Sequence, residues 1–449
     1  MLEIFEISDP RARERMSRLS RRLEELGSRA DDPSRERTRK VFGAPLTPAE
    51  VARRIVGDVR ERGDAAVFEY ARKLDRFELS AANVRVAAAE IEAARRAADP
   101  ELMDAIRAAA GNIRAYQRRT LPRDIPLKGK LGLRTGAVYT PVERVGVLVP
   151  AGSAPLVSTL LMCAVPAQVA GVREIAVATP PGPDGSIAPA ILAAAAEIGL
   201  GEIYRVGGCQ AVAALAFGTV SIRKADMIVG PGNVFVMLAK AEVSSVVRMD
   251  APAGPSEILV IADDSARPEL VAADMLSQAE HDALASAVLA TTSGELAAAV
   301  REQIERQLAG LSRRETARRS IDGCGLAVVC RSLDECVEAA NELAPEHLEL
   351  MVRQPQELLP KIRHAGAVFI GESTPEAVGD YLAGPSHTLP TGGNARMWSG
   401  LAAESFMKRI SLIESSPEWL SSEGARIVTL ASAEGLDAHA VSVRRRLCP

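Results

Sequence analysis

Short apolar, β-branched runs alternate with helix-like segments over most of this chain, and this alternation limits the folds that the chain can adopt. In residues 141–250, runs such as RVGVLVP, EIAVATP and ADMIVGPG are separated by segments such as STLLMCAVPAQVAG. A second series begins at SEILVIADD and covers residues 251–381. Strands that alternate with helices of this length form parallel sheets through crossover connections. Because the runs are apolar throughout, we expect helices on both faces of each sheet.

The alternation predicts an α/β protein with two such domains, residues 141–250 and residues 251–381. A chain of 449 residues is long enough for about two to four domains. Residues 1–45 are highly charged and predict a helical arm, and residues 46–140 predict a helical part that packs with the second α/β domain. Residues 382–449 predict a loop-rich segment with a short helical tail. Ligands are expected at the carboxyl ends of the strands and in the cleft between the domains.

Charge and cysteine content exclude several classes of protein. The net charge is −4, so no broad basic surface indicates a nucleic-acid partner. The N-terminus is charged and lacks the apolar core of a secretory signal, and no apolar run is long enough to span a membrane. The six cysteines show no Cys-x-x-Cys spacing and are typical of reduced, buried thiols. We therefore expect a cytoplasmic protein without a membrane or nucleic-acid partner.

Histidine is scarce, and all five histidines lie in the second half of the chain. In the segment MLSQAEHDA, Gln278 and His281 are three residues apart, so they are neighbours if the segment is helical. A catalytic zinc is bound by about three or four nitrogen, oxygen or sulfur ligands. Gln278, His281, Asp380 and His439 offer such ligands, but each one taken singly is more often a capping or buried structural residue. No compact metal motif such as His-Glu-x-x-His is present, and His364 is assigned no role.

Glu346 and His347 are adjacent in the segment APEHLEL, at the start of an expected strand. A carboxylate beside an imidazole is a suitable acid–base pair, because the pKa of histidine lies near neutrality. A surface glutamate next to a packed histidine explains these letters equally well.

Three glycine-containing turns follow expected strands, in VPAGSAPLVST, VGGCQAVAAL and VGPGNVFV. Each could bring the amide groups of a helix N-terminus close to an anion, and together they predict a cleft of the size of a cofactor. Glycine at such turns is often only conformational, and no G-x-G-x-x-G motif follows any expected strand.

From Leu46 to its end, the chain closely resembles the histidinol dehydrogenase family. The motifs that carry the resemblance are long and ordered: VGGCQAVAALAFGT, VGPGNVFVMLAK, PAGPSEILVIAD, LSQAEHD, APEHLEL, GDYLAGPSHTLPTGG and EGLDAH. The resemblance implies two incomplete Rossmann-like domains and a homodimer in which the C-terminal segment is exchanged. It also implies oxidation of L-histidinol to L-histidine through L-histidinal, the last steps of histidine biosynthesis, with NAD and one zinc ion per subunit.

The resemblance also implies roles for individual residues. Glu346 and His347 would be the acid–base residues, and Gln210 and Asn233 would contact NAD. The zinc ligands would be Gln278, His281, Asp380 and His439. Substrate contacts would involve these six metal-binding and acid–base residues together with Ser256, His387 and Glu434. Glu434 and His439 would complete the site of the neighbouring subunit.

The chain departs from the family pattern at one place in the cofactor turn. The family usually has an aromatic residue before its (I/V)PGG motif, whereas this chain has Leu148 and Ala151 in VLVPAGSAP. The loss of one stacking contact weakens cofactor packing by roughly 0.5–1.5 kcal/mol.

Three other functions remain open from the sequence. A dehydrogenase of the same fold could act on another small alcohol, such as sulfopropanediol. A zinc hydrolase could use Glu346 to activate water without a redox step. A binding protein without catalysis is the third possibility, which the acid–base pair disfavours.

Overall fold

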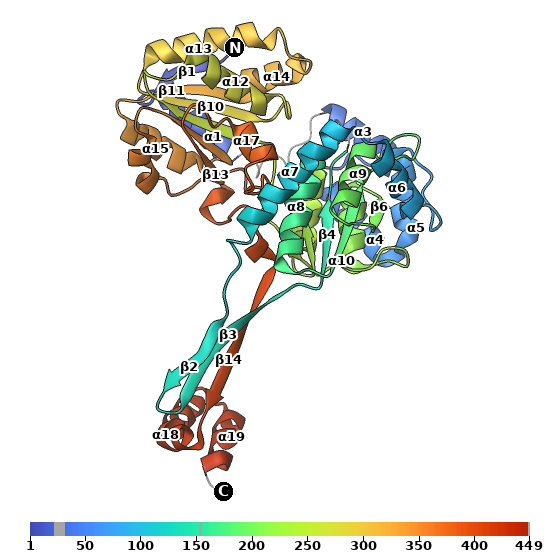
Figure 1. Ribbon diagram of the computed structural model, residues 1–449, viewed down its shortest axis with the longest axis vertical. Coiled ribbons are helices and arrows are strands. Elements are labelled where there is room, and N and C mark those ends of the chain that lie inside the picture. Colours follow the sequence, from blue (N-terminus) through green and yellow to red (C-terminus); the bar gives the residue numbers. More distant parts are fainter. Residues whose placement is uncertain (22–31, 152–154, 448–449) are drawn as a thin grey trace.

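The chain forms two α/β lobes and a long arm that projects away from them (Figure 1). The computed structural model describes residues 1–21, 32–151 and 155–447. The lobes are built on a five-stranded and a six-stranded sheet, and the strands of both sheets are parallel. The α/β fold class with two parallel sheets is therefore confirmed, whereas exchange of the C-terminal segment stays a prediction. None of the described helices is long and apolar enough to cross a membrane.

The first lobe has the strand order β6-β5-β4-β7-β8. Val147 at the centre of this sheet pairs with Val177 and Val229 on the neighbouring strands. The side chain of Val147 packs with α8 and α9 on one face, and Leu148 packs with α10 and α11 on the other. Helices thus cover both faces, as the apolar strands predict. The elements are β4 (Arg144–Leu148), α8 (Val157–Ala170), β5 (Glu174–Thr179), α9 (Pro189–Glu197), β6 (Ile203–Arg205), α10 (Gly208–Phe217), β7 (Met227–Val229), α11 (Val234–Val243) and β8 (Arg248–Met249).

The helices of residues 46–140 pack on the first lobe, so the expected packing with the second α/β domain is wrong. Helix α4 contacts α10 and α11, α6 contacts α9, and α7 contacts α8. Val51, Ile55 and Val59 form the buried face of α4 and join the core beside Leu215 and Val236. The bounds are α4 (Pro48–Arg62), α5 (Asp64–Tyr70), a π-helical turn (Ala71–Asp75), α6 (Ala88–Ala97) and α7 (Pro100–Gln117), and α3 (Asp32–Phe42) precedes them in the chain.

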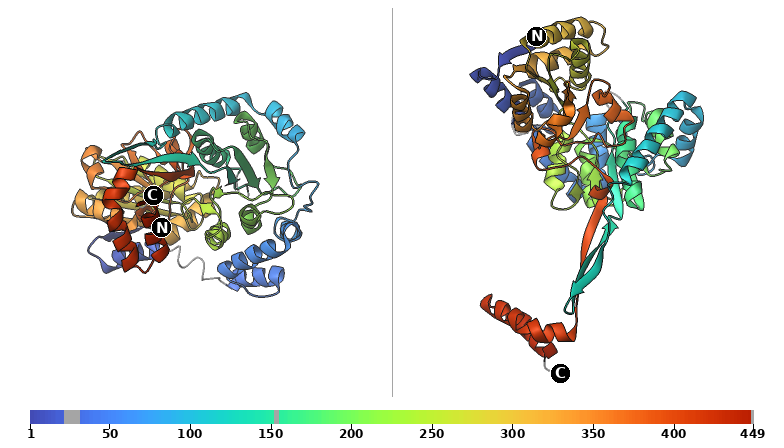
Figure 2. Two further views of the ribbon diagram at one scale, coloured as in Figure 1. Left: turned by 90° about the horizontal axis from the view of Figure 1, so that it is seen from below. Right: turned by 60° about the vertical axis from the view of Figure 1, so that its left-hand side comes forward.

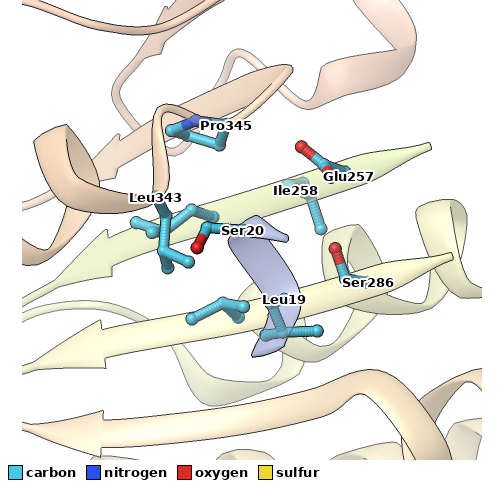
Figure 3. Close-up of a pocket in the computed structure, with 9 residues that line it drawn as sticks. Leu19, Ser20, Glu257, Ile258, Ser286, Leu343 and Pro345 are labelled. Atoms are coloured by element: carbon cyan, nitrogen blue, oxygen red, sulfur yellow. The ribbon is translucent and has the colours of Figure 1, made fainter. Parts of the chain in front are cut away.

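The second lobe has the strand order β1-β11-β10-β9-β12-β13 and includes the N-terminus of the chain. Residues 1–45 are therefore not only a helical arm, because Glu3–Glu6 pair with β11 as an edge strand. The end of α1, at Leu19 and Ser20, packs over the starts of two central strands, where Glu257 and Ser286 lie (Figure 3). The N-terminal segment thus completes the second lobe.

The helices and strands of the second lobe have the following bounds. They are β1 (Glu3–Glu6), α1 (Pro10–Ser20), β9 (Glu257–Ala262), α12 (Pro268–Ala279), β10 (Ser286–Thr291), α13 (Gly294–Leu308), α14 (Arg314–Cys324), β11 (Gly325–Val329), α15 (Leu333–Leu343), β12 (His347–Met351), α16 (Pro355–Leu358), β13 (Ala367–Ile370) and α17 (Glu376–Tyr381).

The arm is an antiparallel sheet that ends in two helices, and the right-hand view in Figure 2 shows it extending away from the two lobes. Strand β14 (Met407–Ser415) pairs with β3 (Leu133–Pro141) over the full length of both strands, and β2 (Ile125–Lys130) pairs with the other edge of β3. Helices α18 (Pro417–Ala433) and α19 (Asp437–Leu447) pack on each other at the tip. Helices α18 and α19 therefore lie far from the second lobe of their own chain (Figure 1).

Candidate active site

His347 is the first residue of β12, and its imidazole ring is buried. The Nδ1 atom lies 2.9 Å from the backbone carbonyl oxygen of Glu257, so Nδ1 carries a proton and donates it to that carbonyl. The Nε2 atom has no hydrogen-bond partner among the described residues. It faces Glu376 Oε1 at 3.7 Å and Asp380 Oδ1 at 3.9 Å. Nε2 is thus a buried base in front of two carboxyl groups.

Burial lowers the pKa of His347, and the nearby Glu376 carboxylate raises it in part. The ring of Phe369 lies beside the imidazole, with its centroid 5.8 Å away. The neutral form of His347, which can accept a proton, is therefore favoured before substrate binds.

Glu346 lies directly before β12 and is also buried. Its Oε2 atom accepts a hydrogen bond of 2.9 Å from the backbone N–H of Glu257 and lies 3.7 Å from His347 Nδ1. Burial raises the pKa of the Glu346 carboxyl well above its ordinary value. The alternative of a surface glutamate is wrong, because only 6% of Glu346 is exposed.

Glu376 and Asp380 form the acidic part of the site, one turn apart on α17. Together with His347 they are a group of three possible metal ligands, with ligand atoms within 4.8 Å of one another. Burial, followed by the charge of Glu376, raises the pKa of Asp380 well above its ordinary value. Asp380 was predicted as a site residue and Glu376 was not, although a four-residue spacing on a helix places both on one face.

Gln278 is completely buried in the last turn of α12. Neither the oxygen nor the nitrogen of its amide has a hydrogen-bond partner in the described part of the chain. A buried amide without partners is costly, so it indicates a ligand that this chain alone does not supply. His281 follows two residues after the helix in a turn closed by its own N–H and the Gln278 carbonyl, and its side chain is exposed.

The metal-ligating groups of this site fit a divalent cation such as zinc. They comprise imidazole nitrogen, amide oxygen and carboxylate oxygen, which zinc accepts. One predicted zinc ligand atom, Gln278 Oε1, is buried and has no partner among the described residues. A cation would also offset the repulsion between Glu376 and Asp380.

His387 connects the site to the first lobe. Its Nε2 atom lies 3.3 Å from Thr159 Oγ1 on α8, and its Nδ1 atom lies 3.6 Å from Asp380 Oδ1. Burial lowers the pKa of His387 to about 4. Ser256, a further predicted contact, precedes β9 next to Glu257 and is half-buried.

The site residues of the second lobe lie at the amino ends of its strands, so the expected carboxyl-end position is wrong for this lobe. Glu346 and His347 begin β12, and Gln278 and His281 come before β10. Helix α17, which follows β13, carries Asp380 back toward this edge.

Glu434 and His439 are not brought to this site within one chain. Glu434 directly follows α18 and His439 lies on α19, and both residues are exposed. The two helices form the tip of the arm (Figure 1). Three of the four predicted metal ligands thus belong to the second lobe, and the fourth lies at the other end of the molecule.

Two predicted cofactor contacts lie at the carboxyl ends of strands in the first lobe. Gln210 is buried in the first turn of α10, where its Nε2 atom donates to Asp75 Oδ2 at 3.1 Å and its Oε1 atom has no partner among the described residues. Asn233 caps α11 by accepting the backbone N–H groups of Phe235 and Val236. The unpartnered Gln210 oxygen fits a polar cofactor at this edge.

The turns beside these residues are closely packed. Gly230 has a φ of 111°, and a Cβ atom there would lie 2.2 Å from the carbonyl oxygen of Leu148, so only glycine fits. The side chain of Leu148 belongs to the buried core, and Ala151 is half-buried against the other face of the sheet. Residues 152–154 of the same turn lie outside the described residues.

Comparisons with known proteins agree with this geometry. The family profile described as histidinol dehydrogenase matches residues 46–447. A histidinol dehydrogenase of Synechococcus sp. is 52% identical over 394 residues, which are 88% of this chain and 91% of that protein. A histidinol dehydrogenase of Moorella thermoacetica is 51% identical over 88% of this chain and 93% of its own length.

A solved structure shows the same architecture. The crystal structure of histidinol dehydrogenase from Elizabethkingia anophelis superimposes with a TM-score of 0.87 at 36% identity, and the match covers 99% of this chain and 98% of that chain. With the profile, the relatives and the structure in agreement, the chain belongs to the histidinol dehydrogenase family.

Proposed function

We propose that this enzyme oxidises L-histidinol to L-histidine through L-histidinal, with two molecules of NAD as hydride acceptors and one zinc ion per subunit. Family membership supports the reaction. The observation that carries the proposal is the orientation of His347, whose Nε2 atom is buried, has no partner among the described residues and faces the acidic cluster.

Gln278, His281 and Asp380 of one subunit would hold the zinc together with the partner subunit's His439. When bound, zinc would supply a Lewis acid that orients the substrate through its amine and imidazole groups. The unpartnered amide of Gln278 supports this assignment, because a metal bond would satisfy its oxygen.

In the first step, His347 Nε2 takes the proton of the substrate hydroxyl group while the carbinol carbon loses a hydride. The hydrogen bond from Nδ1 to the Glu257 carbonyl stabilises the imidazolium ion that results. In the second step, Glu346 takes a proton from the water molecule that adds to the aldehyde carbon, and a second hydride then leaves. The nicotinamide ring of NAD, when bound, accepts the hydride in each step.

The first lobe would bind NAD through Gln210 and Asn233. Ser256, His387 and the partner subunit's Glu434 would contact the substrate. His387 reaches Thr159 of the first lobe and lies beside Asp380 of the second, so it is placed where both halves of the site meet.

A homodimer would bring the tail of one subunit to the site of the other. The arm exposes apolar side chains that are costly to leave in water, including Leu131 at 91%, Ile413 at 77% and Leu430 at 66%. Burial of this surface against a second copy would also supply the missing Glu434 and His439. The free cysteines of the described residues, all of them buried, support action in the reducing cytoplasm.

The decisive experiment supplies L-histidinol and NAD to the zinc-loaded enzyme and counts NADH. Formation of two NADH for each histidine produced is the expected result. Turnover with a sulfonated diol but not with histidinol would instead identify a related dehydrogenase of the same fold. Product release without any NADH absorbance would identify a hydrolase.

A further inference from the structure

Behind the candidate site lies a pair of buried carboxyl groups that the proposed reaction does not use. Glu349 of β12 is 1% exposed and Asp274 of α12 is 8% exposed. The two carboxyl groups lie within hydrogen-bonding reach of each other.

Glu349 also holds the start of α17. Its Oε1 atom accepts a hydrogen bond of 2.9 Å from the backbone N–H of Glu376, the first residue of that helix. Ser277, on α12, adds a second link, because its hydroxyl group donates to Glu376 Oε2 at 3.2 Å.

The three elements joined in this way are the ones that carry the site. Glu349 is two residues after His347, so both side chains lie on one face of β12. Asp274 is one helical turn before Gln278, and Glu376 is one turn before Asp380. One hydrogen-bonded group therefore fixes the relative positions of a base and two predicted metal ligands.

The stability of the core does not explain why carboxyl groups are used here. Apolar residues of similar volume usually stabilise a core as well as a buried polar pair does, or better. Hydrogen bonds have directions, however, and can set the register of one element against another in a way that apolar contacts cannot.

We propose that Glu349 and Asp274 are positioning residues that hold α12 and α17 against β12, so that Gln278 and Asp380 converge on the metal. This proposal rests on the proposed zinc-dependent function. Residues that orient metal ligands typically change metal affinity about 10–100-fold when they are removed.

The test measures zinc affinity by competition with a chelator in the full-length dimer. Glu349→Ala is expected to weaken zinc binding about 10–100-fold and to alter the visible spectrum of the cobalt-substituted protein. Glu349→Gln keeps an oxygen for the Glu376 N–H and an N–H for Asp274, so it is expected to restore affinity and spectrum. Asp274→Ala, which leaves the Glu376 hydrogen bond intact, is expected to weaken binding to a smaller extent.

Asn341→Ala is the matched control. Asn341 is a buried polar residue of the same lobe, but it binds the backbone of residues 361–364, which hold none of the predicted site residues. Its removal is expected to lower the melting temperature and to leave zinc affinity unchanged. Wild-type affinity in Glu349→Ala, equal losses in Glu349→Ala and Asn341→Ala, or failure of Glu349→Gln to restore binding would each overturn the proposal.

Amide hydrogen exchange over residues 376–381 separates this proposal from the proposed function. Faster exchange there in Glu349→Ala than in Glu349→Gln is expected with or without metal, and equal rates would contradict the positioning role. If the wild-type protein binds no zinc, the proposed function fails, whereas the exchange result still decides whether Glu349 fixes α17.

Discussion

The imidazole of His347 donates from Nδ1 to the carbonyl oxygen of Glu257, 2.9 Å away, and this contact leaves Nε2 as the nitrogen that can accept a proton. Because Nδ1 is engaged by the backbone of β9, only Nε2 can accept a proton from a substrate in the proposed reaction. The base is thus set by the pairing of two neighbouring strands, since His347 pairs with Ile258, the residue after Glu257.

His347→Asn is expected to lower kcat by about 10²–10⁴-fold while zinc content stays at the wild-type level, because the proton acceptor is lost and the metal ligands remain. His281→Asn is expected to lose both activity and zinc. Metal analysis and initial rates of NADH formation check both variants. Wild-type rates in both variants would contradict the assignment of roles.

Glu346→Gln is expected to affect the second oxidation more than the first. Glutamine keeps an oxygen for the Glu257 N–H but cannot take a proton from water, so oxidation of histidinal should fall about 10²–10⁴-fold. Oxidation of histidinol to histidinal should be slowed much less. Separate assays with the alcohol and the aldehyde measure the two steps, with the exposed Glu372→Gln as a control that is expected to behave as wild type. Equal losses of rate in both assays would contradict a role in the second step alone. Glu346 would then act in both steps or only stabilise the fold.

Gly379→Ala is expected to disturb the site by a steric route. A Cβ atom at Gly379 would lie 2.7 Å and 2.8 Å from two carbons of the Phe369 ring, which packs beside His347. Such overpacking costs about 1–3 kcal/mol and would displace α17 with Asp380. Urea unfolding and kcat/KM should both show the loss. Gly323→Ala is the control, because a Cβ atom there meets nothing within 4 Å and alanine favours a helix; a similar loss in this variant would contradict the steric explanation.

The sequence predicted the two sheets well because the alternation of strand and helix is encoded locally. It also singled out Glu346, His347, Gln278 and Asp380, which lie in long motifs and belong to the second lobe; their roles stay predictions. It did not predict which lobe the α4 helix joins, because an amphipathic face shows that a surface is buried but not against what. The strand Glu3–Glu6 was missed for a similar reason, since four residues with charged ends have no pattern outside the sheet that they extend.

Glu376 and Glu349 were missed because their roles depend on tertiary contacts. Glu376 lies in a helix of six residues, too short to show a clear periodicity. Glu349 alternates with apolar residues in β12, a pattern typical of a strand with one solvent face, yet both faces of this strand are covered. The position of the site at the amino ends of the strands likewise depends on the return of α17 after β13.

Asp75→Asn is expected to stabilise the protein at neutral pH. Burial raises the pKa of Asp75 from 3.8 to about 6, and the hydrogen bond from Gln210 lowers it in part. The contribution of Asp75 to the unfolding free energy is fully present below about pH 4, where the carboxyl group is protonated. It is lost as the pH rises through about 6, whereas asparagine is neutral at every pH. The gain in unfolding free energy of Asp75→Asn over wild type should therefore grow between about pH 4.5 and 7.5, to about 2–3 kcal/mol at most.

Urea unfolding at several pH values measures this gain. Asp184→Asn is a control in which the change in unfolding free energy should have the opposite sign, because hydrogen bonds from Ser186 lower the pKa of Asp184. If the gain in unfolding free energy of Asp75→Asn is the same at every pH, burial does not raise the pKa of the Asp75 carboxyl group.

Mixing of inactive variants tests whether the arm completes the site of a second subunit. His347→Asn alters the lobe and His439→Asn alters the tail, so a mixed dimer would contain one site with both changes and one site with neither. Co-expression should restore about a quarter of the wild-type activity, because about half of the dimers are mixed and each has one intact site. The control pair His439→Asn with Glu434→Gln alters only tails, leaves every site with one change and should restore nothing. Activity that stays absent in the first mixture, with mixed dimers present, would place the tail in its own subunit's site or in none.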